Sequence, residues 1–474
     1  MAEEEKAVNA AISNIAVADD DEEIDMTGYG MGKDVSSHID STSLRCFSIA
    51  DDSEVDISKH LQKEKFADFG IRKDIQKGID LAGYNVPSMI QRATLGIVLD
   101  SNERLIAQAP TGTGKTAAFV IKMLSTVDET KAAPQVLCLV PTAELAHQIA
   151  KTVEVLGKKT NVRHRVVGTQ MDETAVTEHI VIGTLGTLHR LIGKQIPTDD
   201  IICYVIDEAD DLIKVLHPDA AASGKKRSDQ HQQRAKKQLA SISTRLTHPD
   251  LQILFFSATY NEDIRAISST ILQTGKRIAV GKEDDDIAEV NPQNIRHFTL
   301  PVAEFGDKYG ALKVLWQTVL SGAQAIIFVA TRKQAQQLAD RLTADGHQVG
   351  CLQADLDHDQ RRAVMADFRR AATKVLVCTD IISRGVDVPA VRVVVNYDMP
   401  SFLEAHNDTR VDTYLHRVGR CGRYGRDGFA VSLKLQTDAN FDQVTKMVEA
   451  RHGVKFETVG KERLLKIKEE MEGW

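Results

Sequence analysis

The sequence predicts an α/β protein built from two tandem parallel-sheet domains. The chain has 474 residues, which is more than one hydrophobic core commonly serves. Short apolar runs of strand length alternate with helix-forming stretches, a pattern typical of parallel sheets flanked by helices. A charged, apolar-poor segment at 282–294 divides this alternation into two series. We therefore expect two domains with a cleft between them.

The apolar runs give the expected strands in order. The first series has runs at 104–109, 135–140, 179–183, 201–207, 252–257 and 276–280, and the second has runs at 324–330, 348–352, 374–378 and 391–396. Helical patterns such as 143–156 lie between them. We place the first domain at 61–281, the linker at 282–294 and the second domain at 295–474.

The first 60 residues differ in composition from the rest. They contain fifteen acidic and four basic residues, a net charge of −11, whereas the rest of the chain carries +3. Few are large and apolar, so we expect an acidic tail, disordered to about Ser53, with a short helix or strand at 44–57 as the alternative. The N-terminus is acidic and no 18-residue apolar run occurs, so we expect no signal peptide or membrane span, and a soluble monomer.

A phosphate-binding loop is the strongest local signal. The apolar run 104–109 leads directly into APTGTGKT, and glycines allow backbone N–H groups to turn toward phosphate oxygens. Lys115 supplies a cation and Thr116 a hydroxyl for Mg²⁺. Ala109 stands where the general pattern has its first glycine. The pattern predicts a nucleoside triphosphate site formed by Ala109, Pro110, Thr111, Gly112, Thr113, Gly114, Lys115 and Thr116. A glycine-rich turn without a ligand is the alternative, which the rest of the chain makes much weaker.

An acidic cluster follows the apolar run 201–207, which ends in Asp207 and continues with Glu208. A carboxylate at the carboxyl end of a parallel strand beside the phosphate-binding strand can hold Mg²⁺, while its neighbour polarises an attacking water. We expect Asp207 to share the metal with Thr116 and Glu208 to act on the water.

The whole set of motifs, in order from about 66 to 450, resembles the DEAD-box RNA helicases. Residues 207–210 read DEAD, 257–259 read SAT, and 83–91 read GYNVPSMIQ, with Phe66 seventeen residues before Gly83. Downstream stand IIFVATR at 326–332, TDIISRGVDV at 379–388 and HRVGRCGRYG at 416–425. The resemblance implies two RecA-like domains and an ATPase stimulated by RNA, with ATP and Mg²⁺ as cofactors.

The residues that would serve the nucleotide come from both domains. Tyr84 can stack on adenine and Gln91 can hydrogen-bond its edge. By resemblance, Asp387 contacts the ribose, and Arg420 and Arg423 reach the γ-phosphate when the domains close. The residues that would link nucleotide state to closure are Ser257, Thr259, Asp380, Arg384, His416 and Arg417.

RNA would be held through its phosphates and 2′-hydroxyls, independently of sequence, because aromatic residues are only 5% of the chain and are not interleaved with basic ones. Family positions that face RNA correspond to Pro141, Thr142, Gly183, Thr187, Arg332 and Thr379. The chain departs from the family at Ala143, usually Arg, and Leu185, usually Pro. Gln353-Ala354-Asp355 replaces His-Gly-Asp, and His358 stands where Gln is usual. These departures concern RNA binding and domain coupling, not the ATP site.

The segment 401–413 is longer than the corresponding connection in the translation-initiation branch of the family. Together with the acidic tail it resembles the messenger-RNA export helicases of the nuclear pore. That resemblance implies a nucleoporin partner and an MIF4G-type activator with inositol hexakisphosphate, and a place in cytoplasm and nucleus, at the cytoplasmic face of the pore. The alternatives are a translation-initiation or general cytoplasmic helicase, and an ATP-gated RNA clamp with little unwinding, which Ala143 and Leu185 favour.

A basic run at 218–238 separates the acidic tetrapeptide from SAT. It contains six positive charges, at Lys225, Lys226, Arg227, Arg234, Lys236 and Lys237. Its simplest interpretation is a solvated surface insertion, because basic runs are usually exposed. The alternative is an additional contact with RNA phosphates.

Overall fold

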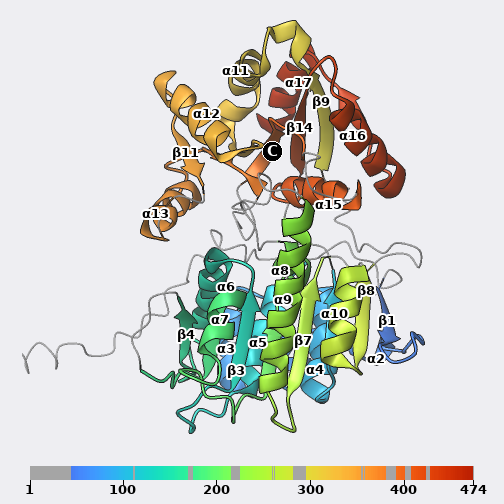
Figure 1. Cartoon of the computed structure of the whole chain (residues 1–474), viewed down its shortest axis with the longest axis vertical. Helices are drawn as coiled ribbons and strands as arrows, with labels where there is room; N and C mark the ends of the chain where they lie inside the picture. The colour runs from blue at the N-terminus through green and yellow to red at the C-terminus, as the bar shows by residue number, and fades with distance from the viewer. Residues whose placement is uncertain are drawn as a thin grey trace, which may run out of the picture.

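The structure is a computed structural model in which the two halves of the chain form two stacked domains (Figure 1). It describes residues 44–109, 113–168, 174–214, 225–258, 260, 262–280, 295–353, 356, 358–380, 391–400, 407–422 and 427–472. Within these ranges, no helix is both long enough and apolar enough to cross a bilayer. All six cysteines are free thiols.

The first domain contains an eight-stranded sheet in the order β1-β8-β2-β7-β6-β3-β5-β4. Its strands are β1 (Leu44–Ser48), β2 (Leu105–Gln108), β3 (Val136–Val140), β4 (His164–Val167), β5 (Ile180–Thr184), β6 (Cys203–Ile206), β7 (Gln252–Ser257) and β8 (Lys276–Val280). All neighbours pair in parallel except β1, which runs antiparallel to β8. Strands β2, β3 and β6 are buried at every position, as expected for a sheet covered on both faces.

Helices cover both faces of this sheet, and an apolar cluster lies between the helices and the sheet on each face. They are α2 (Ser58–Leu61), η3 (Phe66–Phe69), α3 (Lys73–Leu81), α4 (Met89–Asp100), α5 (Lys115–Thr126), α6 (Ala143–Leu156), α7 (Leu185–Leu191), α8 (Ala209–Lys214), α9 (Lys225–Arg245) and α10 (Glu262–Leu272). The helix expected at 143–156 is α6, whose first turn is capped by Thr142.

The second domain contains a seven-stranded parallel sheet in the order β11-β12-β10-β13-β14-β9-β15. Its strands are β9 (Ile295–Pro301), β10 (Gln324–Phe328), β11 (Val349–Leu352), β12 (Val375–Cys378), β13 (Val391–Asn396), β14 (Gly428–Lys434) and β15 (Phe456–Thr458). Its helices are η5 (Val302–Phe305), α11 (Lys308–Thr318), η6 (Leu320–Gly322), α12 (Arg332–Ala344), α13 (His358–Arg369), α15 (Asn407–Val418), α16 (Ala439–His452) and α17 (Lys461–Glu472). Apolar clusters again fill both faces.

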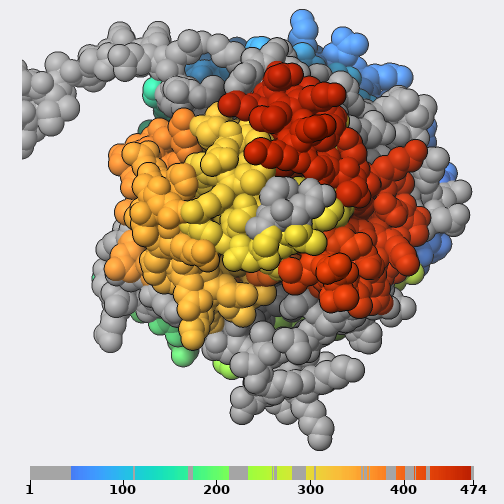
Figure 2. All heavy atoms as spheres, turned by 90° about the horizontal axis from the view of Figure 1, so that it is seen from above, coloured from blue at the N-terminus to red at the C-terminus, as the bar shows by residue number. Residues whose placement is uncertain are grey.

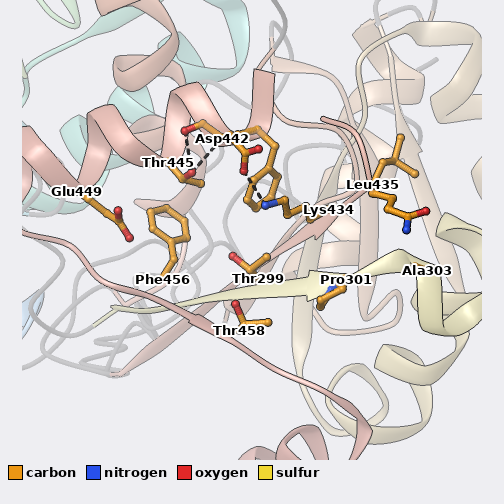
Figure 3. Close-up of a pocket in the computed structure, with 12 residues that line it drawn as sticks. Thr299, Pro301, Ala303, Lys434, Leu435, Asp442, Thr445, Glu449, Phe456 and Thr458 are labelled. Carbon is orange, nitrogen blue, oxygen red and sulfur yellow. Dashed lines mark hydrogen bonds and ion pairs between the residues drawn. The ribbon is translucent and has the colours of Figure 1, made fainter. Parts of the chain in front are cut away.

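The outer surface of the second domain combines early and late parts of its sequence. Viewed from above, residues of α11 and α12, in yellow and orange, lie beside the C-terminal elements in red (Figure 2). A pocket of about 390 Å³ lies between α16 and strands β9 and β15. Figure 3 shows Phe456 and Thr299 on its strand side and Thr445 and Glu449 on its helix side.

The N-terminal part of the fold differs from the expected disorder up to Ser53. Strand β1 pairs with β8 over five residues, and Arg45 donates to both carboxylate oxygens of Glu54 at 2.9 and 2.8 Å. Leu44 and Cys46 are buried, so this strand seals the edge of the first sheet. The alternative of a short strand within 44–57 is therefore confirmed. Residues 1–43 and the expected linker at 282–294 lie outside the described residues.

The basic run also differs from a simple surface insertion. Its residues from Lys225 onward begin the 21-residue helix α9. Ala235, Leu239 and Ile242 on this helix are buried in the core. Residues 225–238, two thirds of the run, therefore belong to a helix that packs on the domain, which the polar composition of residues 218–238 concealed.

Candidate active site between the two domains

The three motif-bearing strands of the first domain are neighbours. Strands β2, β7 and β6 adjoin in that order, so the phosphate-binding loop, the SAT segment and the acidic tetrapeptide begin at the same edge of the sheet. The backbone N–H of Ala109 donates to the carbonyl of Ser257 at 3.1 Å. Ligands of open parallel sheets bind at this carboxyl edge, and here it faces the second domain (Figure 1).

The phosphate-binding loop is held by the segment that was expected to recognise adenine. The side-chain nitrogen of Gln91 donates to the carbonyl of Gly114 at 3.1 Å, and its oxygen accepts from the backbone N–H of Ser88 at 2.8 Å. Ser88 Oγ donates to the carbonyl of Thr113 at 2.8 Å. Tyr84 packs edge-on against Phe66, with ring centroids 6.2 Å apart. Gln91 is thus a support for the loop, a role that sequence reasoning missed.

The loop itself continues into helix α5. Gly114 has a φ of 95°, in the left-handed region that favours glycine, and a Cβ there would lie 2.5 Å from the Gln91 side chain. The ammonium group of Lys115 donates to the carbonyl of Ala109. Thr116 follows in the first turn of the helix. Pro110, Thr111 and Gly112 lie outside the described residues.

The acidic tetrapeptide and the residue that follows it, Asp211, place several carboxyl groups in a buried position. Asp207, Asp210 and Asp211 are each at most 4% exposed. Burial is the largest cause that raises the pKa of Asp207, and nearby Lys115 lowers it. Burial, followed by Asp211 and Asp207, raises the pKa of Glu208. Carboxyl groups so crowded and poorly solvated are stabilised by a cation.

Glu208 has an unusual conformation and an unpaired oxygen. Its φ is 46°, which a residue other than glycine rarely adopts. Its Oε2 is buried and has no hydrogen-bond partner among the described residues. The oxygen donors of Asp207 and Thr116 suit Mg²⁺, and the unpaired Glu208 oxygen suits a water beside that metal. The residues present therefore fit the expected metal.

Side chains of both domains meet at this acidic cluster. Ser257 Oγ donates to Asp210 Oδ1 at 2.9 Å within the first domain. From the second domain, His416 places Nε2 3.6 Å from Asp210 Oδ2 and Nδ1 3.8 Å from Asp211 Oδ1. Arg420 Nε donates to the carbonyl of His416 at 3.0 Å. The positive charge of Arg420 is one of the causes that lower the pKa of Glu208.

Arg417 has a different environment from the other two basic residues. It is 2% exposed, and its guanidinium donates to both carboxylate oxygens of Asp380. It also donates to Asn396 Oδ1 at 3.1 Å and to the carbonyl of Asp398 at 2.6 Å. These hydrogen bonds join the ends of β12 and β13 inside the second domain. Arg417 thus attaches the C-terminal end of α15 to the sheet of its own domain.

An ion pair between an arginine and a glutamate also joins the domains, and it was not expected from the sequence. Arg361 Nη1, on α13, lies 3.1 Å from Glu144 Oε1, on α6. Both side chains are largely buried, so solvent screens the pair less than it would screen a surface pair. No local pattern predicts such a pair, because its partners are more than 200 positions apart in the sequence.

The expected RNA-facing residues lie at the carboxyl ends of strands in both domains. Pro141 and Thr142 follow β3, Gly183 belongs to β5, and Thr187 stands on α7, where its hydroxyl lies 3.2 Å from that of Thr184. Arg332 begins α12 and Thr379 follows β12. Leu185, which replaces the usual proline, is 3% exposed and packs in the core. Thr259, Arg384, Asp387 and Arg423 lie outside the described residues.

Comparisons with known proteins agree with this arrangement. The family described as DEAD/DEAH box helicase matches residues 88–267, and the helicase conserved C-terminal domain matches residues 307–425. The ATP-dependent RNA helicase DBP5 of Candida glabrata is 35% identical over 374 residues, which cover 78% of this chain and 69% of the relative. The chain belongs to the DEAD-box helicases. It is accordingly an ATP-dependent RNA helicase with an ATPase that RNA stimulates.

Other members of the family are also similar. The ATP-dependent RNA helicase eIF4A of Candida glabrata is 32% identical over 394 residues, covering 82% of this chain and 91% of the relative. Saccharomyces cerevisiae Dbp5 bound to RNA and ADP BeF3 has a TM-score of 0.74 at 29% identity, covering 86% of this chain and 99% of that one. A variant of this yeast protein bound to Nup159, Gle1, IP6 and ADP has a TM-score of 0.59 at 29% identity, covering 85% and 100%.

Proposed function

We propose that this helicase remodels RNA or RNA–protein complexes by ATP-driven closure of its two domains, and that it acts in messenger-RNA export. The observation that carries the first part is the approach of His416, from the second domain, to Asp210 and Asp211, the buried carboxylates that follow β6 in the first. A nucleotide bound between these groups would be contacted by both domains, so its presence would favour the closed arrangement.

The proposed chemistry assigns a separate role to each group. Lys115 and the loop amides bind the phosphates, while Asp207 and Thr116 hold Mg²⁺, which supplies charge neutralisation when bound. Glu208 accepts a proton from the attacking water through its unpaired oxygen. Arg420, with Arg423, stabilises the charge that develops on the transferred phosphoryl group, and it does so only when the domains approach.

The RNA-binding part of the proposal rests on the strand ends. The residues expected to face RNA occupy the carboxyl edge of both sheets, on the side where the domains meet. Backbone contacts from such positions do not read bases, so binding would be independent of sequence. Because Ala143 stands where the family usually has Arg, this surface has one positive charge fewer than is usual. The strength of RNA binding therefore has to be measured.

The export assignment is supported by the likeness to DBP5 and by the complexes that its yeast homologue forms. We propose that a nucleoporin, and an MIF4G-type activator with inositol hexakisphosphate, bind this chain as well, at the cytoplasmic face of the pore. The eIF4A likeness is only slightly lower in identity, so a binding experiment has to distinguish the two branches.

One series of ATPase measurements tests the proposal. Hydrolysis is measured alone, with RNA, and then with a nucleoporin fragment, an activator fragment and inositol hexakisphosphate added. We expect stimulation at both steps. Stimulation by RNA without any effect of the second set would count against export and favour a translation-initiation or general role. A strand-separation assay on a short duplex then distinguishes a helicase from an ATP-gated clamp, which would bind RNA without unwinding it.

A further inference from the structure

The guanidinium of Arg277 is enclosed by two aromatic rings at the edge of the first sheet. Its Cζ lies 4.6 Å from the ring centroid of Phe47 and 4.7 Å from that of Tyr260. Phe47 stands on β1 directly opposite Arg277 on β8, so both side chains point to the same face of the sheet. Distances of this size are typical of attractive contacts between cations and aromatic rings.

Each group in this stack belongs to a different part of the domain. Tyr260 directly follows the Ser257-Ala258-Thr259 segment and is 7% exposed. Arg277 Nη1 also lies 3.4 Å from Gln108 Oε1, at the last residue of the strand that enters the phosphate-binding loop. The stack therefore touches the ends of β2 and β7, the two strands whose loops carry the phosphate-binding and SAT motifs.

Strand β1 holds Phe47 in place independently of the stack. The backbone N–H of Ile49 donates to the carbonyl of Gly275 at 2.9 Å, and that of Val55 donates to the carbonyl of Cys46 at 2.8 Å. The Arg45 guanidinium also approaches the Phe47 ring, with its Cζ 5.0 Å from the ring centroid. Strand β1 lies before residue 88, where the match to the DEAD/DEAH box helicase family begins. It nevertheless supplies one of the two rings that contact Arg277, near the ends of the strands that carry the motifs.

We propose that Phe47 and Arg277 are positioning residues for ATP hydrolysis. They hold Tyr260 so that the chain leaving β7 keeps Ser257 within hydrogen-bond distance of Asp210, the carboxylate that His416 approaches from the second domain. The proposal rests on the proposed function, in which closure of the two domains links ATP binding to hydrolysis. It adds β1 to the elements on which this closure depends.

The ring of Phe47 contributes in two ways, by a cation–π contact with the Arg277 guanidinium and by the apolar surface that it buries. A leucine at position 47 would still cover β8 and bury apolar surface, but it would offer no aromatic face to the guanidinium. The two contributions can therefore be separated by substitution: Phe47→Leu keeps most of the edge packing, Phe47→Ala removes it, and Phe47→Tyr keeps both.

The test compares these variants in the full-length chain with Arg277→Lys, which keeps the charge but removes the planar group. The control is Phe69→Leu, which replaces another ring that faces a cation, with Lys63 Nζ 4.8 Å from its centroid. For every variant we measure thermal unfolding, the KM for ATP, and ATP turnover with and without RNA.

We expect Phe47→Leu and Arg277→Lys to lower RNA-stimulated kcat about two- to fivefold, the size of effect expected when one cation–ring interaction is removed, with less than about a twofold change in the KM for ATP. Phe47→Leu should unfold near the wild-type temperature, and Phe47→Tyr should retain wild-type turnover. The proposal is overturned if Phe47→Leu turns over ATP like wild type, or if Phe69→Leu lowers kcat equally. Wild-type turnover that does not respond to RNA would instead contradict the proposed function itself.

Discussion

At the scale of single residues, burial determines the chemistry of the acidic cluster. Glu208 directly follows Asp207, has a left-handed backbone conformation, and has one buried carboxylate oxygen without a hydrogen-bond partner among the described residues. The raised pKa values of both carboxyls show that the site is unfavourable for their charges in isolation. A bound Mg²⁺ would reverse this, because a nearby cation favours the charged carboxylates, so the residues are arranged for a ligand and not for stability.

Replacing Glu208 by Gln tests its role in hydrolysis. We expect ATP turnover to fall at least about a hundredfold, the lower range for loss of a general base, because glutamine keeps the shape but cannot accept the proton. ATP and RNA binding should remain, since Asp207 and Lys115 are unchanged. Single-turnover hydrolysis and fluorescence titration of ATP measure the two quantities. Turnover near the wild-type rate would remove Glu208 from the mechanism. Lys115→Ala is the contrasting variant, because it should weaken ATP binding itself.

Replacing Arg420 by Ala tests whether the second domain completes the site. We expect RNA-stimulated kcat to fall by about two to three orders of magnitude with little change in ATP affinity, because the guanidinium contributes when the domains are closed. Lys434→Ala is a suitable control, since this cation of the same domain pairs with Asp442 at 2.6 Å beside the pocket in Figure 3. An equal loss of ATP affinity in Arg420→Ala would mean that the arginine binds the ground state.

At the scale of elements, the sequence predicted ten of the strands, including every one that carries a motif, and missed β4, β9, β14 and β15. Strands β2, β3, β6 and β7 are continuous apolar runs ended by recognisable residues, so both their type and their function could be inferred. Strands β4, β9 and β15 contain charged or polar residues, as in HRVV at 164–167, and they are strands because of the neighbours with which they pair. Strand β14, in contrast, is an apolar run that the sequence interpretation did not include. Contacts such as Arg361–Glu144 and Phe47–Arg277 depend on the tertiary arrangement, which no local pattern records.

The contact between β9 and α15 predicts a pH dependence of stability. His297 Nδ1 lies 2.7 Å from the hydroxyl of Tyr414, and burial lowers the pKa of His297 to about 4. The unfolded chain, with an ordinary histidine pKa of about 6.5, binds the proton more readily, so this group destabilises the fold as the pH falls from about 6.5 to 4. The decrease in stability is on the order of 3 kcal/mol.

Denaturant unfolding followed by tryptophan fluorescence measures this effect, because both tryptophans, Trp316 and Trp474, belong to the second half of the chain. We expect His297→Gln to make stability less dependent on pH between 7 and 4. His452 is another histidine of the second domain whose pKa burial lowers to about 4, and His452→Gln provides the comparison. An unchanged pH dependence in His297→Gln would show that the His297–Tyr414 contact does not control the titration.

Helix α9 gives a prediction about RNA. It ends shortly before β7 begins, and β7 runs toward the second domain, so the basic N-terminal end of α9 is directed to the domain junction (Figure 1). Replacing Lys225, Lys226, Arg227, Arg234, Lys236 and Lys237 by Gln should weaken RNA binding and reduce its salt dependence, by about 0.7 in log–log slope for each RNA phosphate that is no longer neutralised. ATPase without RNA should be unchanged. The same change at Lys461, Lys466 and Lys468 of α17 is the control, and an unaltered slope in the α9 variant would place the run away from RNA.

At the scale of the whole molecule, charge is distributed unequally along the chain. Residues 1–43 contain eleven acidic and two basic residues, a net charge of −9, and the remaining chain carries +1. An acidic segment can compete with RNA for basic residues of the body, such as Arg332 among the expected RNA-facing positions. Because β1 starts at Leu44 and supplies Phe47, this effect has to be tested without removing the strand.

Deleting residues 1–43 should therefore raise RNA affinity and basal ATPase at low salt, with a smaller difference at high salt, because screening weakens the competition. In a second variant of full length, the eleven acidic residues become Asn or Gln. If charge is the cause, this variant should behave like the deletion. If the effect is steric, only the deletion should raise RNA affinity and basal ATPase. Deleting residues 1–53 would also remove β1 and lower turnover by removing the stack on Arg277, so comparison of the two deletions separates the tail from the strand. RNA affinity and basal ATPase that do not change in the shorter deletion at low salt would show that the tail only solvates the protein.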